Sequence, residues 1–243
     1  NRSDIENQAG FVYFFRRQID GSWAEESRLS SPEGTLTTDV FAVSVAMNAI
    51  GNKVFIGARG TTNSNGTQGC VYMSDLESQW TKPIVVATPP TNTLSGRFGN
   101  SVACSANSEL LFVSEPNSRI SPSTLYGCVW VFELVNGIYE YKNKILPPVL
   151  SANTASGFGL NIACSKDCTV LAISSSSSGQ TVSYEGLVHI FVRKNEQTHE
   201  WVYIKTLRCD DPEANNAFGR GLSMTSEADI LFVGANQEIA GKY

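Results

Sequence analysis

The chain has 243 residues, of which 42% are hydrophobic and 17% charged, and a formal net charge of −5. This composition supports a buried core and argues against disorder, which requires low hydrophobicity and high net charge. No basic stripe accompanies the acidic balance, so we expect no nucleic-acid partner. No apolar run approaches the roughly 18 residues of a membrane-spanning helix, so we expect no membrane insertion in this segment.

A unit of about 60 residues recurs along the chain, and two anchors define it. A phenylalanine opens the first strand of each unit at intervals of 57, 60 and 60 residues: Phe41, Phe98, Phe158 and Phe218. A glycine opens the third strand at intervals of 59, 58 and 59 residues: Gly10, Gly69, Gly127 and Gly186. Because independent anchors keep one period, chance is a poor explanation.

Each unit reads as four short strands, best seen in FGNSVACS, ELLFVSEP, GCVWVF and YEYKNKILPP of residues 98–148. The first strand alternates small residues, which suits a crowded axis where sheets converge. The second and third are apolar on both faces, as expected of a sheet covered on both sides. The fourth is more polar and ends in prolines, as an outer edge should. The pattern predicts an all-β fold, a β-propeller of four-stranded antiparallel blades.

In chain order, the predicted units are a half blade at 1–32, blades at 41–90, 98–148 and 158–212, and a half blade at 218–243. Together they make four blade equivalents. Two arrangements are open: an excerpt of a larger ring, such as a seven-bladed one, or a four-bladed ring closed by pairing the half blades. The opening NRSDIENQAG has no initiator Met, which is typical of a processed chain or an excerpt.

These motifs resemble the FG-GAP repeat family. FG stands at 98–99, 158–159 and 218–219 and becomes FA at 41–42. The GAP position reads GAR at 57–59, SEP at 114–116 and GAN at 234–236, and is lost at 174–176. The resemblance covers nearly the whole chain and extends to the propeller of integrin α-subunits and to microbial surface proteins. It implies a seven-bladed propeller that binds protein ligands.

The resemblance also raises the question of calcium, which integrin-type blades hold in a DxDxDG loop between strands one and two. The corresponding hairpins here are AMNAIGNKV, ACSANSELL, ACSKDCTVL and SMTSEADIL. None has two acidic residues at ligand spacing followed by glycine, which this oxygen-seeking ion requires. We therefore expect no metal and no cofactor.

No catalytic constellation stands out. His189 lies within the strand GLVHIF, where sister units have Tyr and Trp, so we expect it to pack. His199 lies in the hydrophilic KNEQTHE segment, where we expect it to be solvated. No nucleophile motif accompanies either histidine. Six cysteines are present, and their recurrence at equivalent strand positions, Cys104 with Cys164 and Cys70 with Cys128, favours mostly free thiols over bridges.

The remaining candidates are the loops between strands two and three, at 60–68, 117–126 and 176–185. They share one face of the disc, and loops on a rigid scaffold often carry binding residues. We expect Tyr126 and Tyr184, at equivalent loop positions, to anchor a partner, with Arg119 and Asn65 nearby. The alternative is that the tyrosines cap the adjacent strand. Asn65 and Asn1 stand in glycosylation sequons.

The leading function is therefore a non-enzymatic protein-interaction or structural module, at a cell surface or in an extracellular assembly. The alternative is a lectin-like propeller that binds glycans in pockets between blades. A propeller hydrolase is the third reading. Fold-level analogy carries most of this ranking.

Overall fold

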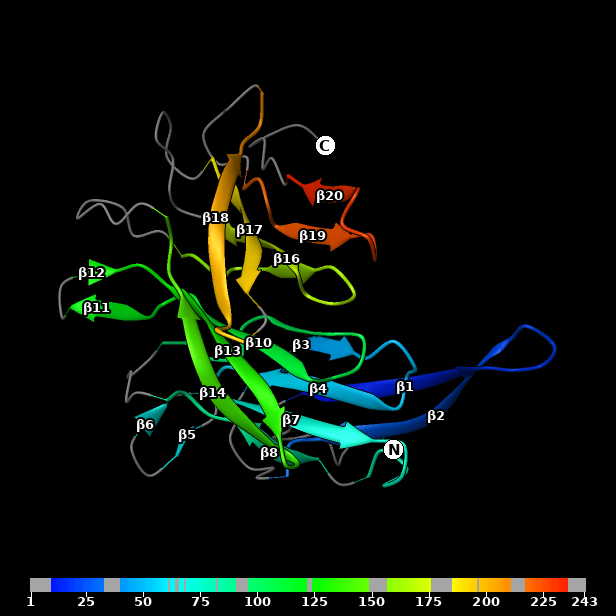
Figure 1. Cartoon of the computed structure of the whole chain (residues 1–243). Helices are drawn as coiled ribbons and strands as arrows, with labels where there is room; N and C mark the ends of the chain where they lie inside the picture. The colour runs from blue at the N-terminus through cyan, green and yellow to red at the C-terminus, as the bar shows by residue number, and fades with distance from the viewer. Residues whose placement is uncertain are drawn as a thin grey trace, which may run out of the picture.

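The computed structural model describes residues 10–32, 40–60, 62–63, 66–67, 69–81, 83–90, 96–121, 124–148, 157–175, 185–195, 197–210 and 217–235. Within these ranges all regular structure is β-strand, and the strands form antiparallel sheets. Three of the sheets are four-stranded, which confirms the predicted class of a β-propeller built from antiparallel blades (Figure 1). None of the described residues forms a helix suited to crossing a membrane.

The three complete blades follow one another along the chain. Blade 1 consists of β3 (Phe41–Met47), β4 (Lys53–Ala58), β7 (Cys70–Asp75) and β8 (Ile84–Ala87). Blade 2 consists of β9 (Val102–Cys104), β10 (Leu110–Glu115), β13 (Cys128–Val135) and β14 (Ile138–Ile145). Blade 3 consists of β15 (Ile162–Cys164), β16 (Val170–Ser175), β17 (Leu187–Asn195) and β18 (Glu200–Leu207).

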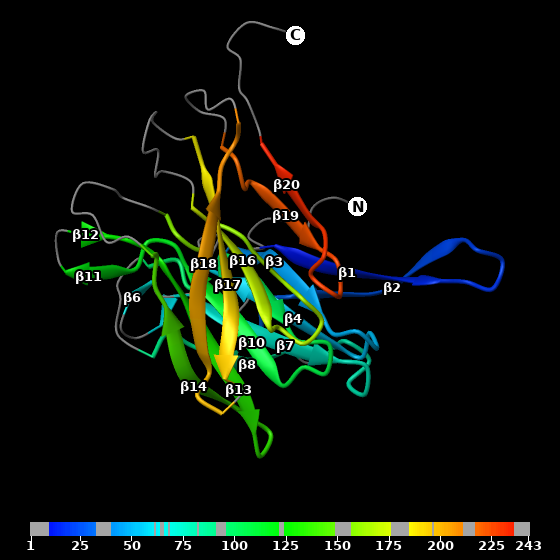
Figure 2. The same ribbon diagram turned by 45° about the horizontal axis from the view of Figure 1, so that its top comes forward.

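Two-stranded sheets lie at both ends of this series. The N-terminal half-blade is β1 (Phe11–Arg17) with β2 (Trp23–Ser30), and the C-terminal half-blade is β19 (Gly221–Met224) with β20 (Leu231–Gly234). The β1–β2 hairpin extends away from the other sheets in both views (Figures 1 and 2). Two small hairpins interrupt blades 1 and 2: β5 (Thr62–Asn63) with β6 (Gly66–Thr67), and β11 (Arg119–Ser121) with β12 (Thr124–Leu125).

The hydrophobic core lies between successive blades. Along β13, Val129 and Val131 join a cluster with residues of blade 3, whereas Trp130 and Phe132 join a cluster with residues of blade 1. Alternate side chains of one strand therefore fill two different interfaces, as the period of two requires. This explains why the second and third strands read as apolar on both faces.

The two anchors of the repeat meet at the junction between blades. A Cβ added to the glycine that opens each third strand would lie 2.1–2.3 Å from the carbonyl oxygen of the phenylalanine that opens the next unit. The pairs are Gly10 with Phe41, Gly69 with Phe98, Gly127 with Phe158, and Gly186 with Phe218. Only glycine allows this approach of two backbones, so the two residue types recur with one period.

A second junction links the turns between first and second strands through main-chain atoms. Ala49 N donates to Ala106 O at 3.1 Å, Ala106 N to Lys166 O at 2.7 Å, and Lys166 N to Ser226 O at 3.0 Å. One hydrogen bond thus joins each turn to its counterpart in the next unit. The series runs through the three complete blades and the C-terminal half-blade and keeps their turns on one face in register.

Candidate functional site

The face predicted to bind a partner carries the two small hairpins. The β5–β6 and β11–β12 hairpins project on the side of the molecule opposite the tip of the β1–β2 hairpin (Figure 1). They come from the predicted loops 60–68 and 117–126, so both loops contain regular structure that the sequence pattern did not predict. The third predicted loop, 176–185, lies outside the described residues except for Glu185.

The base of the loop 117–126 is fixed by backbone hydrogen bonds. The carbonyl of Ser118 accepts from Tyr126 N and from Gly127 N, each at 3.1 Å, and Asn117 N donates to Gly96 O at 3.0 Å. Above this base, Arg119 pairs with Leu125. The loop is therefore a short hairpin whose base is closed by the hydrogen bonds of Ser118 to Tyr126 and Gly127. We call this base the closed neck of the loop.

A buried carboxylate lies directly below this loop. Glu115, at the end of β10, is fully buried and accepts a hydrogen bond from Trp130 Nε1 at 2.8 Å. A Cβ on Gly96 would lie 1.9 Å from Glu115 Oε1, so a larger residue at this point would require the buried Glu115 side chain to move. Burial, and then the Glu115 carboxylate, raise the pKa of the neighbouring Cys128 thiol to about 12. The base of the loop is therefore closely packed and held by hydrogen bonds to a buried carboxylate.

The predicted anchors differ in what they offer to a partner. Arg119 is exposed on β11. Tyr126 is only 8% exposed, which leaves it little surface for a partner and agrees with the alternative that it caps the adjacent strand. Tyr184, Asn65 and Asn1 lie outside the described residues.

The opposite face holds a polar pocket that the sequence did not indicate. Its cavity of about 470 Å³ lies between the turns of blades 2 and 3. It is lined by Ser105, Ala106, Asn107, Glu109, Leu110, Glu133, Lys166, Asp167 and Arg193. Five of these nine side chains are ionisable and none is aromatic, so the pocket suits a hydrophilic ligand and offers no ring for stacking.

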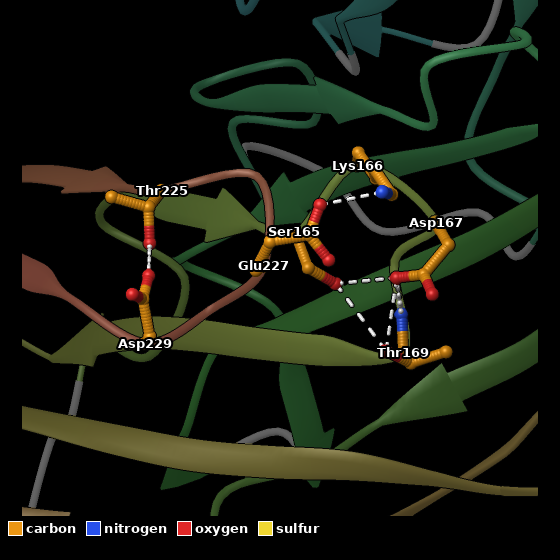
Figure 3. Close-up of polar contacts among 7 residues, drawn as sticks. All are labelled: Ser165, Lys166, Asp167, Thr169, Thr225, Glu227 and Asp229. Atoms are coloured by element: carbon orange, nitrogen blue, oxygen red, sulfur yellow. Dashed lines mark hydrogen bonds and ion pairs between the residues drawn. The ribbon is translucent and has the colours of Figure 1, made fainter.

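The turn of blade 3 at the rim of this pocket is held by its own side chains (Figure 3). Asp167 Oδ1 accepts from Ser165 Oγ at 2.8 Å, from Thr169 Oγ1 at 2.9 Å and from Thr169 N at 3.1 Å. Burial opposes ionisation of Asp167, but these hydrogen bonds prevail and lower its pKa below its ordinary value. The carboxylate therefore caps its own turn and stays charged.

The next turn along the chain also has a hydrogen bond from a hydroxyl to a carboxylate. Thr225 Oγ1 donates to Asp229 Oδ1, and a salt bridge joins Lys166 to Glu227 across the two turns (Figure 3). The hydrogen bond to Glu227 raises the pKa of Lys166. Asp167 and Asp229 are engaged within their own turns and Glu227 across them, and no group of three metal-ligating side chains occurs among the described residues.

The prediction that His199 is solvated is wrong. His199 is buried at the edge of the pocket, where Arg193 donates to its Nδ1 at 3.2 Å and its Nε2 lies 3.3 Å from Glu133 Oε2. Because Nδ1 accepts, the proton sits on Nε2 and points to the carboxylate. Glu133 belongs to blade 2 and His199 to blade 3, so this contact depends on blade packing that the local sequence does not reveal.

His189 lies in the core, as its packing role requires. Ser175 Oγ is 3.0 Å from its Nε2 and Thr206 Oγ1 is 2.9 Å from its Nδ1. Burial lowers the pKa of His189 to about 4, so the ring is neutral at physiological pH. The six cysteines are free thiols; the Sγ atoms of Cys164 and Cys168 lie 3.1 Å apart.

No family model and no curated protein matches the chain. Among solved structures, it is similar to the protein described as TolB from Agrobacterium tumefaciens, with a TM-score of 0.51 and 10% identity over 91% of this chain and 59% of that one. The Dos1 propeller aligns with a TM-score of 0.48 and 13% identity, over 93% of this chain and 60% of that one. The tricorn protease aligns with a TM-score of 0.48 and 12% identity, over 91% and 22%.

The chain thus spans less than two thirds of the length of each of these proteins. The TolB likeness supports the fold, whereas the two lower scores add nothing to it. At identities this low, a shared fold says nothing about activity. Blade topology and the TolB likeness together establish a β-propeller chain.

Proposed function

We propose that the chain is a non-enzymatic protein-interaction module that binds its partner through the loops between strands two and three. The observation that carries the proposal is the β11–β12 hairpin on its closed neck, with Arg119 exposed on it. A surface that is ordered before binding loses less conformational entropy when it docks. Because the partner face also carries β5–β6, one ligand can span two blades.

The resemblance to FG-GAP proteins supports a cell-surface or extracellular location for this module. Membership of that family and the location are both part of the proposal. The sequon at Asn65 provides a cheap test: secretion from a eukaryotic host should yield a protein whose mass falls on deglycosylation, and Asn65→Gln should remove that change. An unmodified secreted protein would contradict the role of Asn65 as an acceptor.

The main test places a photo-cross-linking residue at one of two exposed positions. One is Arg119, on the face that carries the β5–β6 and β11–β12 hairpins, and the other is Glu227, on the opposite face, in the turn between β19 and β20. We expect position 119 to cross-link a defined protein in the native source, and position 227 not to do so. The identified protein is then purified and titrated with wild-type chain, with Arg119→Glu and with the control Glu227→Lys. Loss of binding in the first variant alone supports the proposal, whereas loss in the control alone places the partner on the opposite face.

A second candidate function follows from the pocket between blades 2 and 3. Its position fits a lectin-like propeller, and its carboxylates, amide and guanidinium can pair with sugar hydroxyls. The absence of an aromatic side chain from its lining ranks this candidate second. A glycan array decides it: binding that is lost in Asp167→Ala and retained in Arg119→Glu would favour the glycan reading over the protein partner.

A further inference from the structure

Two cysteine side chains meet in the turn between β15 and β16. Cys164 is the last residue of β15, and Cys168 follows four positions later, shortly before β16 begins at Val170. The Sγ of Cys168 donates to the Sγ of Cys164 at 3.1 Å. A disulfide bond holds its sulfur atoms about 2.05 Å apart, so an approach of roughly 1 Å separates the two thiols from a bridge.

The backbone on both sides of this pair is fixed by hydrogen bonds. Cys164 pairs with Leu171 in the sheet of blade 3. Cys168 N donates to Ser165 O at 2.9 Å, and Cys168 O accepts from Trp201 Nε1 at 3.3 Å. The fold therefore places the two sulfur atoms in contact, and small side-chain rotations complete the approach.

Blade 3 alone among the four repeat units has a cysteine at both positions. In blade 2, Cys104 stands at the position of Cys164, but Ser108 stands at the position of Cys168. The backbone at the second position is left-handed in all four turns, with φ between +56° and +69° at Gly51, Ser108, Cys168 and Ala228. The turn conformation is thus common to the repeat, and the pair of thiols is particular to blade 3.

The two thiols differ in their access to an oxidant. Cys168 is fully buried, whereas Cys164 is partly exposed. The hydrogen bond to Cys164, and then burial, raise the pKa of the Cys168 thiol. Because the thiolate is the form that reacts with oxidants, Cys168 is protected from direct attack. Cys164 is therefore the sulfur that a small oxidant reaches first.

We propose that Cys164 and Cys168 form a site of oxidative modification, at which a peroxide converts the two thiols into a disulfide within the turn. The sulfur of Cys164 attacks one peroxide oxygen, the O–O bond breaks, and Cys164 becomes a sulfenic acid as water leaves. The sulfur of Cys168 then attacks the sulfur of Cys164. The S–S bond forms, the S–O bond breaks, and the departing oxygen takes the proton of Cys168. Two thiols and one hydrogen peroxide thus give one disulfide and two water molecules, with two electrons passing from sulfur to oxygen.

The bridge would close a ring around residues that shape the polar pocket. Ser165, Lys166 and Asp167, which Figure 3 shows at the rim of that pocket, lie between the two cysteines. Lys166 also belongs to the series of main-chain hydrogen bonds that joins successive turns. The modification therefore acts on the face opposite the β11–β12 hairpin, and it is independent of the proposed partner site.

Peptide mapping of the full chain tests the proposal directly. The reduced, folded protein is treated with hydrogen peroxide, its remaining thiols are blocked with N-ethylmaleimide in denaturant, and it is digested with trypsin without reduction. Trypsin cleaves after Lys166, between the two cysteines, so the bridge joins two peptides that are otherwise separate. We expect this linked pair to be at least about tenfold more abundant than any other disulfide, since contact gives a high effective concentration. Dithiothreitol should release the two peptides.

Cys168→Ser is the matched variant, because blade 2 has serine at this position with the same backbone conformation. The linked pair should disappear, and Cys164 should accumulate as a sulfenic acid, which dimedone traps. Cys209→Ser removes another partly exposed cysteine and should retain the bridge.

The digest of the wild-type chain is decisive by itself, whether or not a variant folds. Recovery of both Cys164 and Cys168 as maleimide adducts after peroxide treatment overturns the proposal. So does a digest in which Cys164 is linked mainly to Cys104, or one in which Cys164 ends as a sulfinic acid while Cys168 stays free.

Discussion

At the scale of single residues, the backbone at the start of each unit explains the FG signature. The glycines of the FG pairs, Gly99, Gly159 and Gly219, have φ between +87° and +93°. Ala42, which replaces glycine in the first unit, keeps a φ of +63°. The sequence therefore degenerates at this point while the conformation persists, and the alanine bears the strain of a left-handed backbone.

Replacing Ala42 with glycine should stabilise the chain. Removal of the Cβ relieves a left-handed conformation that costs an L-residue about 1–2 kcal/mol, less the greater flexibility of glycine in the unfolded chain. We expect a net gain of about 0.5–1 kcal/mol in the free energy of unfolding by urea titration. Gly99→Ala, the reverse change at an equivalent position, should destabilise.

His189 makes stability depend on pH. Its pKa falls from 6.5 to about 4 on folding, so the unfolded state binds the proton more readily. The contribution of the neutral ring is complete above pH 6.5 and is lost as the pH falls toward 4. The free energy of unfolding should drop by about 3 kcal/mol over this range.

His189→Gln keeps hydrogen-bonding groups toward Ser175 and Thr206 but cannot titrate. The difference in unfolding free energy between wild type and this variant isolates the histidine from the acidic residues. A difference that stays constant between pH 6.5 and 4 would show that the ring is not held neutral.

Chelation should leave stability unchanged. Asp167 Oδ1 already accepts three hydrogen bonds within its own turn, and Asp229 Oδ1 accepts one from Thr225 Oγ1 within the next turn. The melting temperature should be the same with and without EDTA. A fall of several degrees would contradict the expectation of no metal.

At the scale of elements, the close approach of third-strand glycine to the next unit is the most demanding contact. Gly127→Ala places a Cβ 2.2 Å from Phe158 O and 2.8 Å from Pro116 O, both backbone atoms that cannot move alone. The cost should exceed about 3 kcal/mol, since overpacking adds to the cost of the positive φ of +73°.

Gly137 provides the matched control for that variant. It also has a positive φ, +85°, but no atom lies within 4 Å of an added Cβ. Gly137→Ala should therefore cost only about 1–2 kcal/mol, the conformational part. Equal costs for the two variants in denaturant titrations would show that the junction is not tightly packed.

The strand pattern was predictable from the sequence because it depends on local alternation and on anchors that repeat. The residues ELLFVSEP were expected as a strand, and β10 covers Leu110–Glu115. Contacts between blades were not predictable in this way. His199 meets Glu133 across 66 positions of sequence, and the side chains of the pocket converge only after blades 2 and 3 have packed.

The loops mark a different limit of sequence reading. The strands of the β11–β12 hairpin are too short to show an alternation of apolar and polar residues, so the period of two that marks a strand could not be recognised there. Tyr126 looked like a surface aromatic because it lies in a polar loop, yet the closed neck of that loop buries it. The geometry of a turn, or of the closed neck, depends on which backbone groups hydrogen-bond to each other. The amino-acid composition of the loop does not show this.

At the scale of the whole molecule, stability should be graded along the chain. Blade 2 has a hydrophobic cluster on both faces, whereas each half-blade has one on a single face. In repeat architectures, the stability of a unit depends on the neighbours it contacts. The molecule should therefore open from its ends.

Amide hydrogen exchange followed by mass spectrometry should reveal this gradient. We expect the slowest exchange in β10 and β13, and the fastest among the strands in β1, β2, β19 and β20. Uniform protection across all strands would contradict a gradient set by neighbouring blades.

The hydrogen bonds that join Ala49, Ala106, Lys166 and Ser226 involve only main-chain atoms. Three residue types occupy the four positions, so the junction places no demand on the identity of the side chain there. A gene segment that encodes one unit can therefore be duplicated, deleted or exchanged between copies without adapting this junction to its new neighbour. Such a chain can change its length by recombination, while its hairpin loops diverge independently.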